Sequence, residues 1–240
     1  MRKYLPKIKF ILLIGAVALI SLGANQGQAS DDNQWQILFD GTNLDQWKGY
    51  NTDTIDQQWQ IEGDALYFNP KVLGTGGGSG GDIVSKDQYG DFELNLEWKV
   101  ASGSNSGIFY HAVEDEKFSN VYYNAPEMQV VDNIGHADGH IVKHKAGDLY
   151  DMIASSVDAS NPVGQWNTVR IIVKDNVLEH WLNGQMVVRT TLWDDNWAAL
   201  IANSKFANWP GFGQNKVGHI ALQDHGDPVW YRNIKIKKLD

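Results

Sequence analysis

Residues 90–100, GDFELNLEWKV, decide the fold class. Apolar and polar side chains alternate along this stretch, and the apolar ones are Phe92, Leu94, Leu96, Trp98 and Val100. A period of two residues is typical of a β-strand that turns one face to a hydrophobic core and the other to solvent. The pattern therefore favours an all-β protein with antiparallel sheets.

Segments of the same kind follow along the chain, separated by turn residues. Residues 169–173, 177–183 and 185–191 are three of them, and Asn183–Gly184 joins the last two with the dipeptide most typical of a tight hairpin. About ten or eleven strands with short turns predict an antiparallel sandwich or jelly roll. Residues 193–206 have helical character and predict a short helix or lid. A single domain over residues 30–240 accommodates all of these elements.

The first 29 residues have the composition of an export signal. A basic segment that contains Arg2 and Lys3 precedes an apolar run over residues 10–22, and small residues up to Ala29 offer a cleavage site. The run is short for a bilayer-spanning helix. We therefore expect a cleaved signal peptide over residues 1–29, with an uncleaved anchor as the alternative.

The amino-acid composition restricts the cellular compartment and the classes of binding partner that we expect. The chain contains no cysteine, so lipid attachment to a cysteine behind the signal is excluded, and we expect a periplasmic or secreted protein without a stable membrane anchor. The formal net charge of −9 at pH 7 argues against nucleic acid, whose phosphates require Lys and Arg. The glycine-rich stretch at residues 74–81 lacks the Lys-Ser/Thr pair of a phosphate-binding loop, and we expect no nucleotide cofactor.

A carboxylate lies in the predicted strand PEMQVVDN, residues 126–133. Strand alternation places Glu127 and Gln129 on one face, and Met128 and Val130 on the other. A charged group on a sheet face is costly to bury unless a partner compensates it, so this face indicates a functional site. Asp132 would join Glu127 only through a β-bulge. Paired carboxylates are the usual machinery of glycoside hydrolysis, but the intervening position here is an amide.

Several histidines are candidates for metal binding or proton transfer. His136, His140 and His144 recur every fourth residue, a spacing that suits metal ligation on a helix, although the neighbouring glycines favour a solvated loop. Gln223 and His225 share a strand face near the C-terminus. His111 ends the predicted strand NSGIFYH on the face of Phe109, and His144 precedes a strand-like segment at residues 147–151. His180 has leucines on its own face, which is typical of a buried histidine with satisfied hydrogen bonds.

Three tryptophans have no obvious place in the alternation. Trp59, Trp181 and Trp209 are either ordinary packing residues or flat platforms for the apolar faces of sugar rings.

Seven segments together resemble the 3-keto-disaccharide hydrolase domain family. They are LFDGTNLDQWKGY (38–50), GDFELNLEWKV (90–100), NSGIFYH (105–111), PEMQVVDN (126–133), AGDLYD (146–151), EHWLNG (179–184) and HIALQDHGDPVWYRNIKI (219–236). The resemblance covers nearly all of the chain behind the signal, in order. It implies a concanavalin- or laminarinase-like jelly roll.

The resemblance also implies a chemistry. A sugar 3-dehydrogenase, as functional partner, would oxidise a glucoside or disaccharide at C3, and the ketone would acidify the C2 proton. A base would then remove that proton, and the aglycone would leave C1 by elimination, with or without later addition of water. A divalent metal ion on the keto oxygen would serve as a Lewis acid.

The resemblance suggests roles for particular residues. The expected catalytic residues are Glu127, His144, Asp148 and His225. The expected sugar-positioning residues are Glu97, Asn105, Gln129, Tyr150, Trp181 and Gln223. The expected metal ligands are His111, Glu127 and His225. Two alternatives stay open, a non-catalytic carbohydrate-binding module and a conventional glycosidase of the laminarinase type.

Overall fold

The computed structural model describes Met1, residues 34–72 and residues 81–239. The predicted signal peptide, apart from Met1, and most of the glycine-rich stretch at 74–81 fall outside the described residues, so both remain predictions. Among the described residues, no helix has the length and apolar composition needed to cross a membrane.

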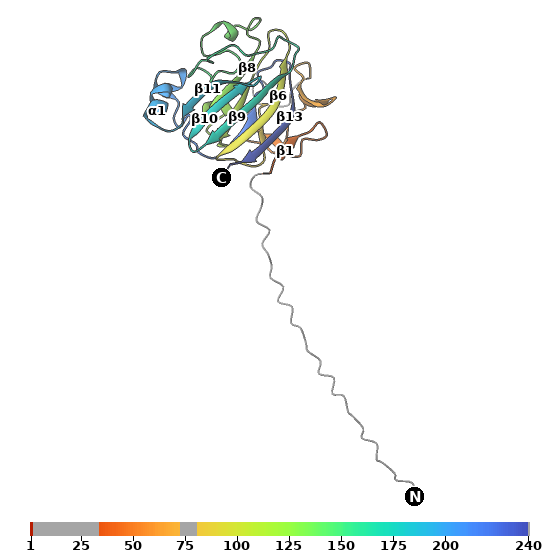
Figure 1. Ribbon diagram of the computed structural model, residues 1–240. Helices are drawn as coiled ribbons and strands as arrows, with labels where there is room; N and C mark the ends of the chain where they lie inside the picture. The colour runs from red at the N-terminus through yellow and green to blue at the C-terminus, as the bar shows by residue number, and fades with distance from the viewer. Residues whose placement is uncertain (2–33, 73–80, 240) are drawn as a thin grey trace. The chain divides into compact units, whose positions relative to one another are not determined.

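Eight antiparallel strands form the larger sheet, which faces the viewer in Figure 1. Its order is β11 (Gln185–Thr191), β10 (Val177–Leu182), β9 (Asn167–Lys174), β6 (Phe92–Val100), β13 (Val229–Lys238), β4 (Ala65–Phe68) and β3 (Trp59–Glu62), with β1 (Gln36–Phe39) paired to β13. The alternating stretch at 90–100 thus lies in the middle of this sheet, between β9 and β13.

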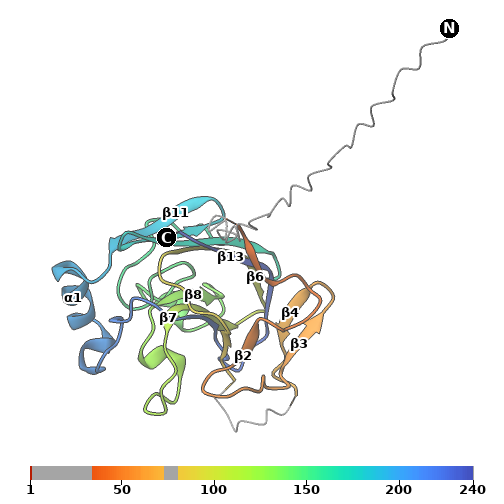
Figure 2. The ribbon, with the colours of Figure 1, turned by 90° about the horizontal axis from the view of Figure 1, so that it is seen from below.

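Five further strands form the smaller sheet, and Figure 2 shows the two sheets as separate layers. The order is β2 (Trp47–Gly49), β5 (Ile83–Ser85), β12 (His219–Leu222), β7 (Asn105–Ala112) and β8 (Glu127–Val131). All recorded strand pairs are antiparallel, and the predicted all-β sandwich is confirmed.

The hairpin turns form where turn chemistry predicts them. Asn183 and Gly184, between β10 and β11, both have positive φ, at 49° and 80°. Asp175 and Asn176, between β9 and β10, also have positive φ, at 50° and 65°. Two successive positive φ values match the right-handed twist of the flanking strands, which explains why short Asn, Asp and Gly residues occupy these positions.

The main hydrophobic core lies between the two sheets. Leu94, Leu96 and Trp98 of β6 enter it from the larger sheet, and Met128 and Val130 of β8 enter it from the smaller one. A second, smaller cluster covers the outer face of the smaller sheet. Its members are Tyr50, Val84, Phe109, Ala112, Val121, Ala125 and Ala221. The smaller sheet is therefore buried on both faces.

The helical elements are short and lie beside the smaller sheet. Helix α1 (Asp195–Ala202) begins behind Asp194, whose side chain accepts a hydrogen bond from the backbone N–H of Trp197 at 2.7 Å. The predicted helix within residues 193–206 is confirmed. The described part of the chain also contains the 3₁₀ turns η1 (Val121–Tyr123), η2 (Asp138–His140) and η3 (Lys205–Asn208).

Residues 147–151, which look strand-like in the sequence, form a turn instead. Leu149 contributes only isolated bridges, to Met128 and to Ile153. Gly147 and Asp151 have positive φ, at 90° and 57°, which interrupts any regular ladder. Some strands, β1, β2 and β5 among them, have only three or four residues, which is too short to show an alternation in the sequence.

Candidate active site

A pocket of about 150 Å³ opens on the outer face of the smaller sheet. Since Met128 and Val130 point into the main core, Glu127 and Gln129 point the other way, into this pocket. Loops around η1, η2 and η3 supply its walls. The lining residues are Asn105, Tyr122, Glu127, Gln129, Asp138, Tyr150, Lys205, Trp209, Gln223 and His225.

Glu127 is the most unusual group in the pocket. It is only 6% exposed, and no hydrogen bond within the described residues reaches its carboxylate. The carboxylate lies against the backbone of Gly107, where any larger side chain would collide with it. Burial raises the pKa of Glu127, nearby Asp82 and Asp138 act in the same direction, and the Lys205 ammonium opposes them. A buried carboxyl without a partner is suited to exchanging a proton with a ligand.

Three amide side chains surround this carboxyl group. Gln129 accepts a hydrogen bond from the backbone N–H of Val130 at 3.0 Å, which leaves its NH₂ group available to a ligand. Asn105 donates to Asp138 at 3.4 Å, while its own Oδ1 is buried without a partner in the described structure. Gln223 completes the set. Amides of this kind bind hydroxyl groups, which both donate and accept.

The opposite wall combines a phenol, a carboxylate and an ammonium group. The Tyr150 hydroxyl donates to Asp138 Oδ2 at 3.2 Å. Lys205 is exposed as a residue, yet its ammonium group lies 4.0 Å from the centre of the Tyr150 ring. Partial desolvation lowers the pKa of Lys205, and Glu127 counteracts this as the leading opposing charge. The pocket thus holds a lysine ammonium group near the carboxyl groups of Glu127 and Asp138.

His144 and Asp148 do not line the pocket. The His144 ring packs on Tyr150 at 4.2 Å between centres, and its Nε2 faces Asp151 Oδ1 at 2.9 Å. Asp148 accepts backbone hydrogen bonds from Lys145 and Ser155, at 2.8 and 2.6 Å. His144 therefore supports the wall from behind, and Asp148 holds the turn that carries Tyr150.

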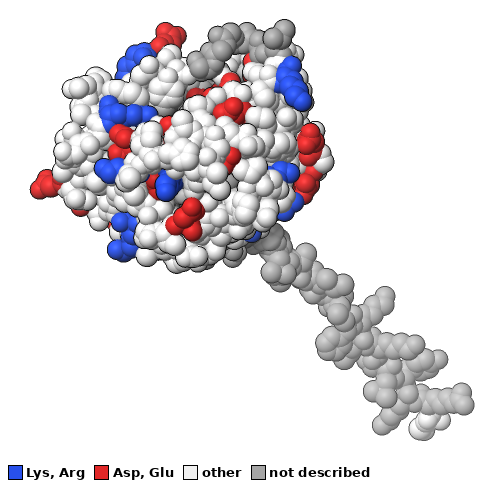
Figure 3. All heavy atoms as spheres, turned by 90° about the horizontal axis from the view of Figure 1, so that it is seen from above, with Lys and Arg blue, Asp and Glu red and all other residues white. Residues whose placement is uncertain are grey.

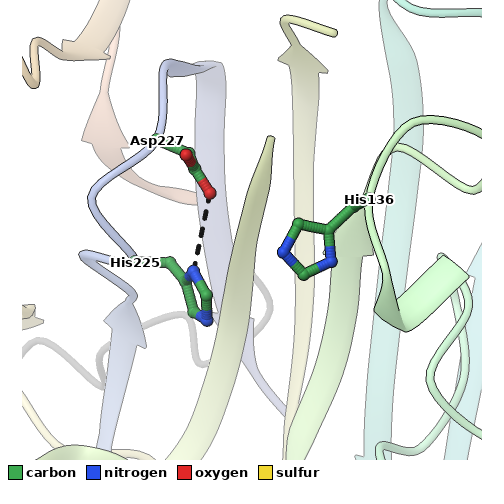
Figure 4. Close-up of side chains that lie close together, drawn as sticks. All are labelled: His136, His225 and Asp227. Atoms are coloured by element: carbon green, nitrogen blue, oxygen red, sulfur yellow. Dashed lines mark ion pairs between the residues drawn. The ribbon is translucent and has the colours of Figure 1, made fainter. Parts of the chain in front are cut away.

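A histidine and carboxylate cluster lies at the edge of the pocket, where His225 forms part of the lining (Figure 4). His136, His225 and Asp227 each place one potential ligand atom within 4.8 Å of the others. His225 Nδ1 faces Asp227 Oδ2 at 3.5 Å. Two imidazoles and a carboxylate suit a divalent transition-metal ion. His136 Nδ1 accepts from the backbone N–H of Asp138 at 3.1 Å, so a metal ion on its Nε2 would require that hydrogen bond to break.

Besides His144 and Asp148, three further predicted site residues, His111, Glu97 and Trp181, are absent from the pocket lining. His111 is buried, and its Nε2 lies 2.9 Å from the carbonyl oxygen of Gly90. Its φ of 54° breaks the alternation of β7, so it does not share the face of Phe109, and the predicted metal set His111, Glu127 and His225 does not converge.

Glu97 and Trp181 lie on the outer face of the larger sheet. Glu97 forms an ion pair with Arg232 at 2.8 Å, and the Trp181 indole donates to Glu179 at 2.8 Å. Both occupy the polar positions of their strands, which point away from the core. The sequence also allows Trp59 and Trp209 as platforms for sugar rings. Trp59 is buried in the core, whereas Trp209 lines the pocket.

Asp132 also lies apart from Glu127. It accepts backbone hydrogen bonds from Gly103 and Ile134 at 2.8 and 2.9 Å, and β8 has no bulge that would turn it toward the pocket. Its task is to hold the loop that leaves the strand.

Sequence patterns missed several lining residues, chiefly Asp138, Lys205 and Tyr122. They come from three loops that are distant in the sequence and have no period. The only available signal was the density of Asn, Asp, Gly and aromatic residues in those loops, which is also typical of ordinary turns.

The sequence is similar to one family of known proteins and to a named member of that kind. Residues 34–237 match the model of the 3-keto-alpha-glucoside-1,2-lyase-like domain family. The chain is 37% identical over 236 residues to a 3-keto-disaccharide hydrolase of Bacteroides thetaiotaomicron, an alignment that covers 88% of this chain and 80% of that protein.

Solved structures agree with this fold. A candidate glycosyl hydrolase from Parabacteroides distasonis ATCC 8503 superposes with a TM-score of 0.78 at 29% identity, over 86% of this chain and 94% of that one. A second candidate glycosyl hydrolase from the same organism gives a TM-score of 0.64 at 26% identity, over 86% of this chain and all of that one (100%).

Proposed function

The chain belongs to the 3-keto-alpha-glucoside-1,2-lyase-like domain family, and from this premise we propose that it cleaves the glycosidic bond of 3-keto-glycosides. The name of the Bacteroides relative supports an enzyme of the glycoside hydrolase type. The observation that carries the proposal is the buried carboxyl group of Glu127, which has no hydrogen-bond partner in the described residues and is surrounded by amides that suit sugar hydroxyls.

Glu127 is the proposed general base. A ketone at C3 acidifies the C2 proton, and a carboxylate whose pKa is raised by burial is better matched to removing that proton near neutral pH than an ordinary surface glutamate. The electron pair of the C2–H bond then forms a C1–C2 double bond while the C1–O bond to the aglycone breaks. The aglycone oxygen takes a proton from water as the C1–O bond breaks, Glu127 returns the C2 proton to the solvent, and addition of water to the double bond, with OH at C1 and H at C2, completes a net hydrolysis.

The other pocket residues hold the sugar and the developing charge. The Lys205 ammonium group stabilises negative charge that spreads toward the C3 oxygen, because it works in a partly desolvated pocket. Asn105, Gln129 and Gln223 hold the ring hydroxyls. The unpartnered Oδ1 of Asn105 gains a donor when a sugar hydroxyl binds.

His136, His225 and Asp227 are the residues that would hold a divalent ion, which when bound would supply Lewis-acid polarisation of the keto oxygen. Without that ion, His225 still contributes a ring nitrogen at the pocket edge, oriented by Asp227. The proposed supplier of the substrate is an enzyme that oxidises a sugar at C3. An exported location, as the N-terminal residues predict, would expose the protein to free glycosides.

Paired substrates test the proposal. The protein is incubated with a 3-keto-glucoside and with the same glucoside unoxidised, in D₂O, with and without a chelator, and is followed by NMR. We expect cleavage of the 3-keto form alone, with deuterium entering at C2. Equal cleavage of the unoxidised glucoside, or a cleaved product that keeps the original proton at C2, would contradict the elimination route. Binding without cleavage would favour a carbohydrate-binding module.

A second candidate function rests on Asp138. It is the second carboxylate in the pocket, and two carboxylates are the ordinary equipment of a glycosidase. Asp138 already accepts from Tyr150 and Asn105, which favours a supporting role. An Asp138→Asn variant separates the two: a conventional glycosidase would lose its activity on unoxidised substrates, whereas the proposed enzyme has none to lose.

A further inference from the structure

One wall of the pocket is organised around Asp138. The hydroxyl group of Tyr150 donates to Asp138 Oδ2 at 3.2 Å, and the side-chain amide of Asn105 donates to the same oxygen at 3.4 Å. All three residues line the pocket. A carboxylate oxygen has about two acceptor positions, so these two donors use the hydrogen-bonding capacity of Oδ2.

Asp138 is supported from behind the wall. The imidazole of His144 lies on the side of its other oxygen, with Nδ1 at 3.7 Å from Oδ1. The carboxylate of Asp151 orients that imidazole, because it lies 2.9 Å from Nε2. This support keeps Oδ2 directed at Tyr150 and Asn105.

The two donors are fixed in their roles. Burial raises the pKa of Tyr150, and the neighbouring carboxyl groups of Glu127 and Asp138 act in the same direction, so the phenol keeps its proton. The Asn105 amide turns its NH₂ group toward Asp138, because an ionised carboxylate accepts and does not donate. These side chains therefore turn acceptors to a ligand: the phenolic oxygen of Tyr150, and Oδ1 of Asn105, which is buried without a partner in the described structure.

Other side chains supply the donors of the pocket. Gln129 uses its carbonyl oxygen for the backbone N–H of Val130 at 3.0 Å, which leaves its NH₂ group for a ligand. The Lys205 ammonium group has donors only. A ketone oxygen can only accept a hydrogen bond, whereas a hydroxyl group can donate one. The pocket is thus divided into a part that can bind a keto oxygen and a part that requires a hydroxyl group.

We infer that Asp138 makes the pocket specific for a free hydroxyl group at C4 of the keto sugar, because it leaves Tyr150 and Asn105 as a pair of acceptors. This inference rests on the proposed function, which places C2 beside Glu127 and the C3 oxygen toward Lys205. The Lys205 ammonium group lies 4.0 Å from the centre of the Tyr150 ring. The ring position that follows C3 therefore reaches the acceptor pair. A reversed sugar would bring its keto oxygen against these acceptors with no donor between them, which costs binding free energy.

Fluorinated substrates test this requirement, because fluorine cannot donate a hydrogen bond. The value of kcat/KM is measured for a 3-keto-glucoside, for its 4-deoxy-4-fluoro analogue and for its 6-deoxy-6-fluoro analogue. With the wild-type protein we expect the 4-fluoro analogue to lose about 30-fold relative to the parent compound, since buried acceptors are left unpaired, and the 6-fluoro analogue to lose less than about threefold. Equal losses at the two positions, or a larger loss at C6, would overturn the inference.

Variants separate the contribution of the protein from the intrinsic reactivity of the analogues. The measured quantity is the ratio of kcat/KM for the parent compound to that for the 4-fluoro analogue, because chemical differences between the substrates cancel when two proteins are compared. Tyr150→Phe removes one acceptor and should lower this ratio about fivefold. Asp138→Asn should lower it as well, since the new amide can donate to Tyr150 and turn that hydroxyl group toward the ligand.

Tyr67→Phe is the matched control. Tyr67 stacks on Trp230 at 4.6 Å between ring centres and lines no part of the pocket. This variant should keep the wild-type ratio. A ratio that falls as far in Tyr67→Phe as in Tyr150→Phe would show that the pocket wall does not read the hydroxyl group.

These outcomes also distinguish the inference from the proposed function. Cleavage of the parent compound with one and the same ratio in the wild type, Tyr150→Phe and Asp138→Asn keeps the proposed enzyme and removes the specificity. Failure of the wild-type protein to cleave any 3-keto-glucoside removes the enzyme and this inference with it. The substrate series on the wild-type protein needs no variant, and it decides the question if either substitution prevents folding.

Discussion

His180 and Glu127 are both ionisable and buried, and they lie on opposite sides of the smaller sheet. Only His180 has hydrogen-bond partners among the described residues. On the core side, His180 of β10 reaches across the sandwich to the Tyr110 hydroxyl of β7 at 3.0 Å, and its Nδ1 lies 3.1 Å from the carbonyl oxygen of Gly147. On the outer side, Glu127 of β8 has no hydrogen-bond partner among the described residues. The first arrangement stabilises the fold, and the second stays available to a ligand.

His180 lies among core residues, whereas Glu127 lies in a pocket lined by polar groups. His180 is fully buried, and burial lowers its pKa to about 4, so it remains neutral under ordinary conditions. Glu127 lines a pocket that also contains the Lys205 ammonium group, two tyrosines and three amides. Figure 3 shows acidic and basic side chains interspersed over one face of the molecule, without a broad patch of a single sign on that face.

The sharpest test of this contrast is Glu127→Gln. We expect activity on a 3-keto-glucoside to fall about 10³-fold, since a general base is removed. The urea midpoint should be unchanged or higher, because the variant no longer buries a carboxyl group without a partner. An active variant, or one that unfolds more easily, would make Glu127 a structural residue like His180.

The pH dependence of stability is the next largest effect. His180 has a folded-state pKa below the unfolded value of about 6.5, so the unfolded chain takes up its proton first. Its contribution is present above pH 6.5 and is lost as pH falls toward 4, by up to about 3 kcal/mol. Urea unfolding at a series of pH values measures the loss, and NMR titration of the imidazole identifies its source. A His180 signal that titrates near 6.5 would contradict the assignment.

The Tyr110→Phe substitution should lower the free energy of unfolding by less than full protonation of His180 does. It removes the hydroxyl opposite His180 Nε2 and leaves that nitrogen buried without a partner, at about 1–3 kcal/mol of unfolding free energy. Activity should stay within about twofold, since the change lies on the core side of the sheet. Lost activity at unchanged stability would show that the two faces are coupled.

The smallest effect is expected on the outer face of the larger sheet. Glu97→Gln, the same substitution as at position 127, should leave kcat/KM within about twofold, because Glu97 pairs with Arg232 outside the pocket. Kinetics on the same 3-keto-glucoside provide the measurement. A loss comparable to that of Glu127→Gln would return Glu97 to the list of sugar-positioning residues.

Strand alternation predicted the fold class because it depends on neighbours in the sequence. The alternation of Leu94, Leu96 and Trp98 and the Asn183–Gly184 turn both appear in the structure as expected. The same rule correctly separated Glu127 and Gln129 from Met128 and Val130. It was wrong at residues 147–151 and at His111, where positive φ values interrupt the strand geometry on which the rule depends.

By itself, the sequence determined that this protein is a two-layer β-sandwich and that one strand carries a carboxylate on its polar face. Only the tertiary structure decided which distant groups join that carboxylate: Lys205 and His225 do, while His111, Glu97 and Trp181 do not. The physical reason is that the period of a strand fixes the direction of a side chain relative to its neighbours. The meeting of loops far apart in the sequence depends instead on how the two sheets pack and where each connection crosses their edges.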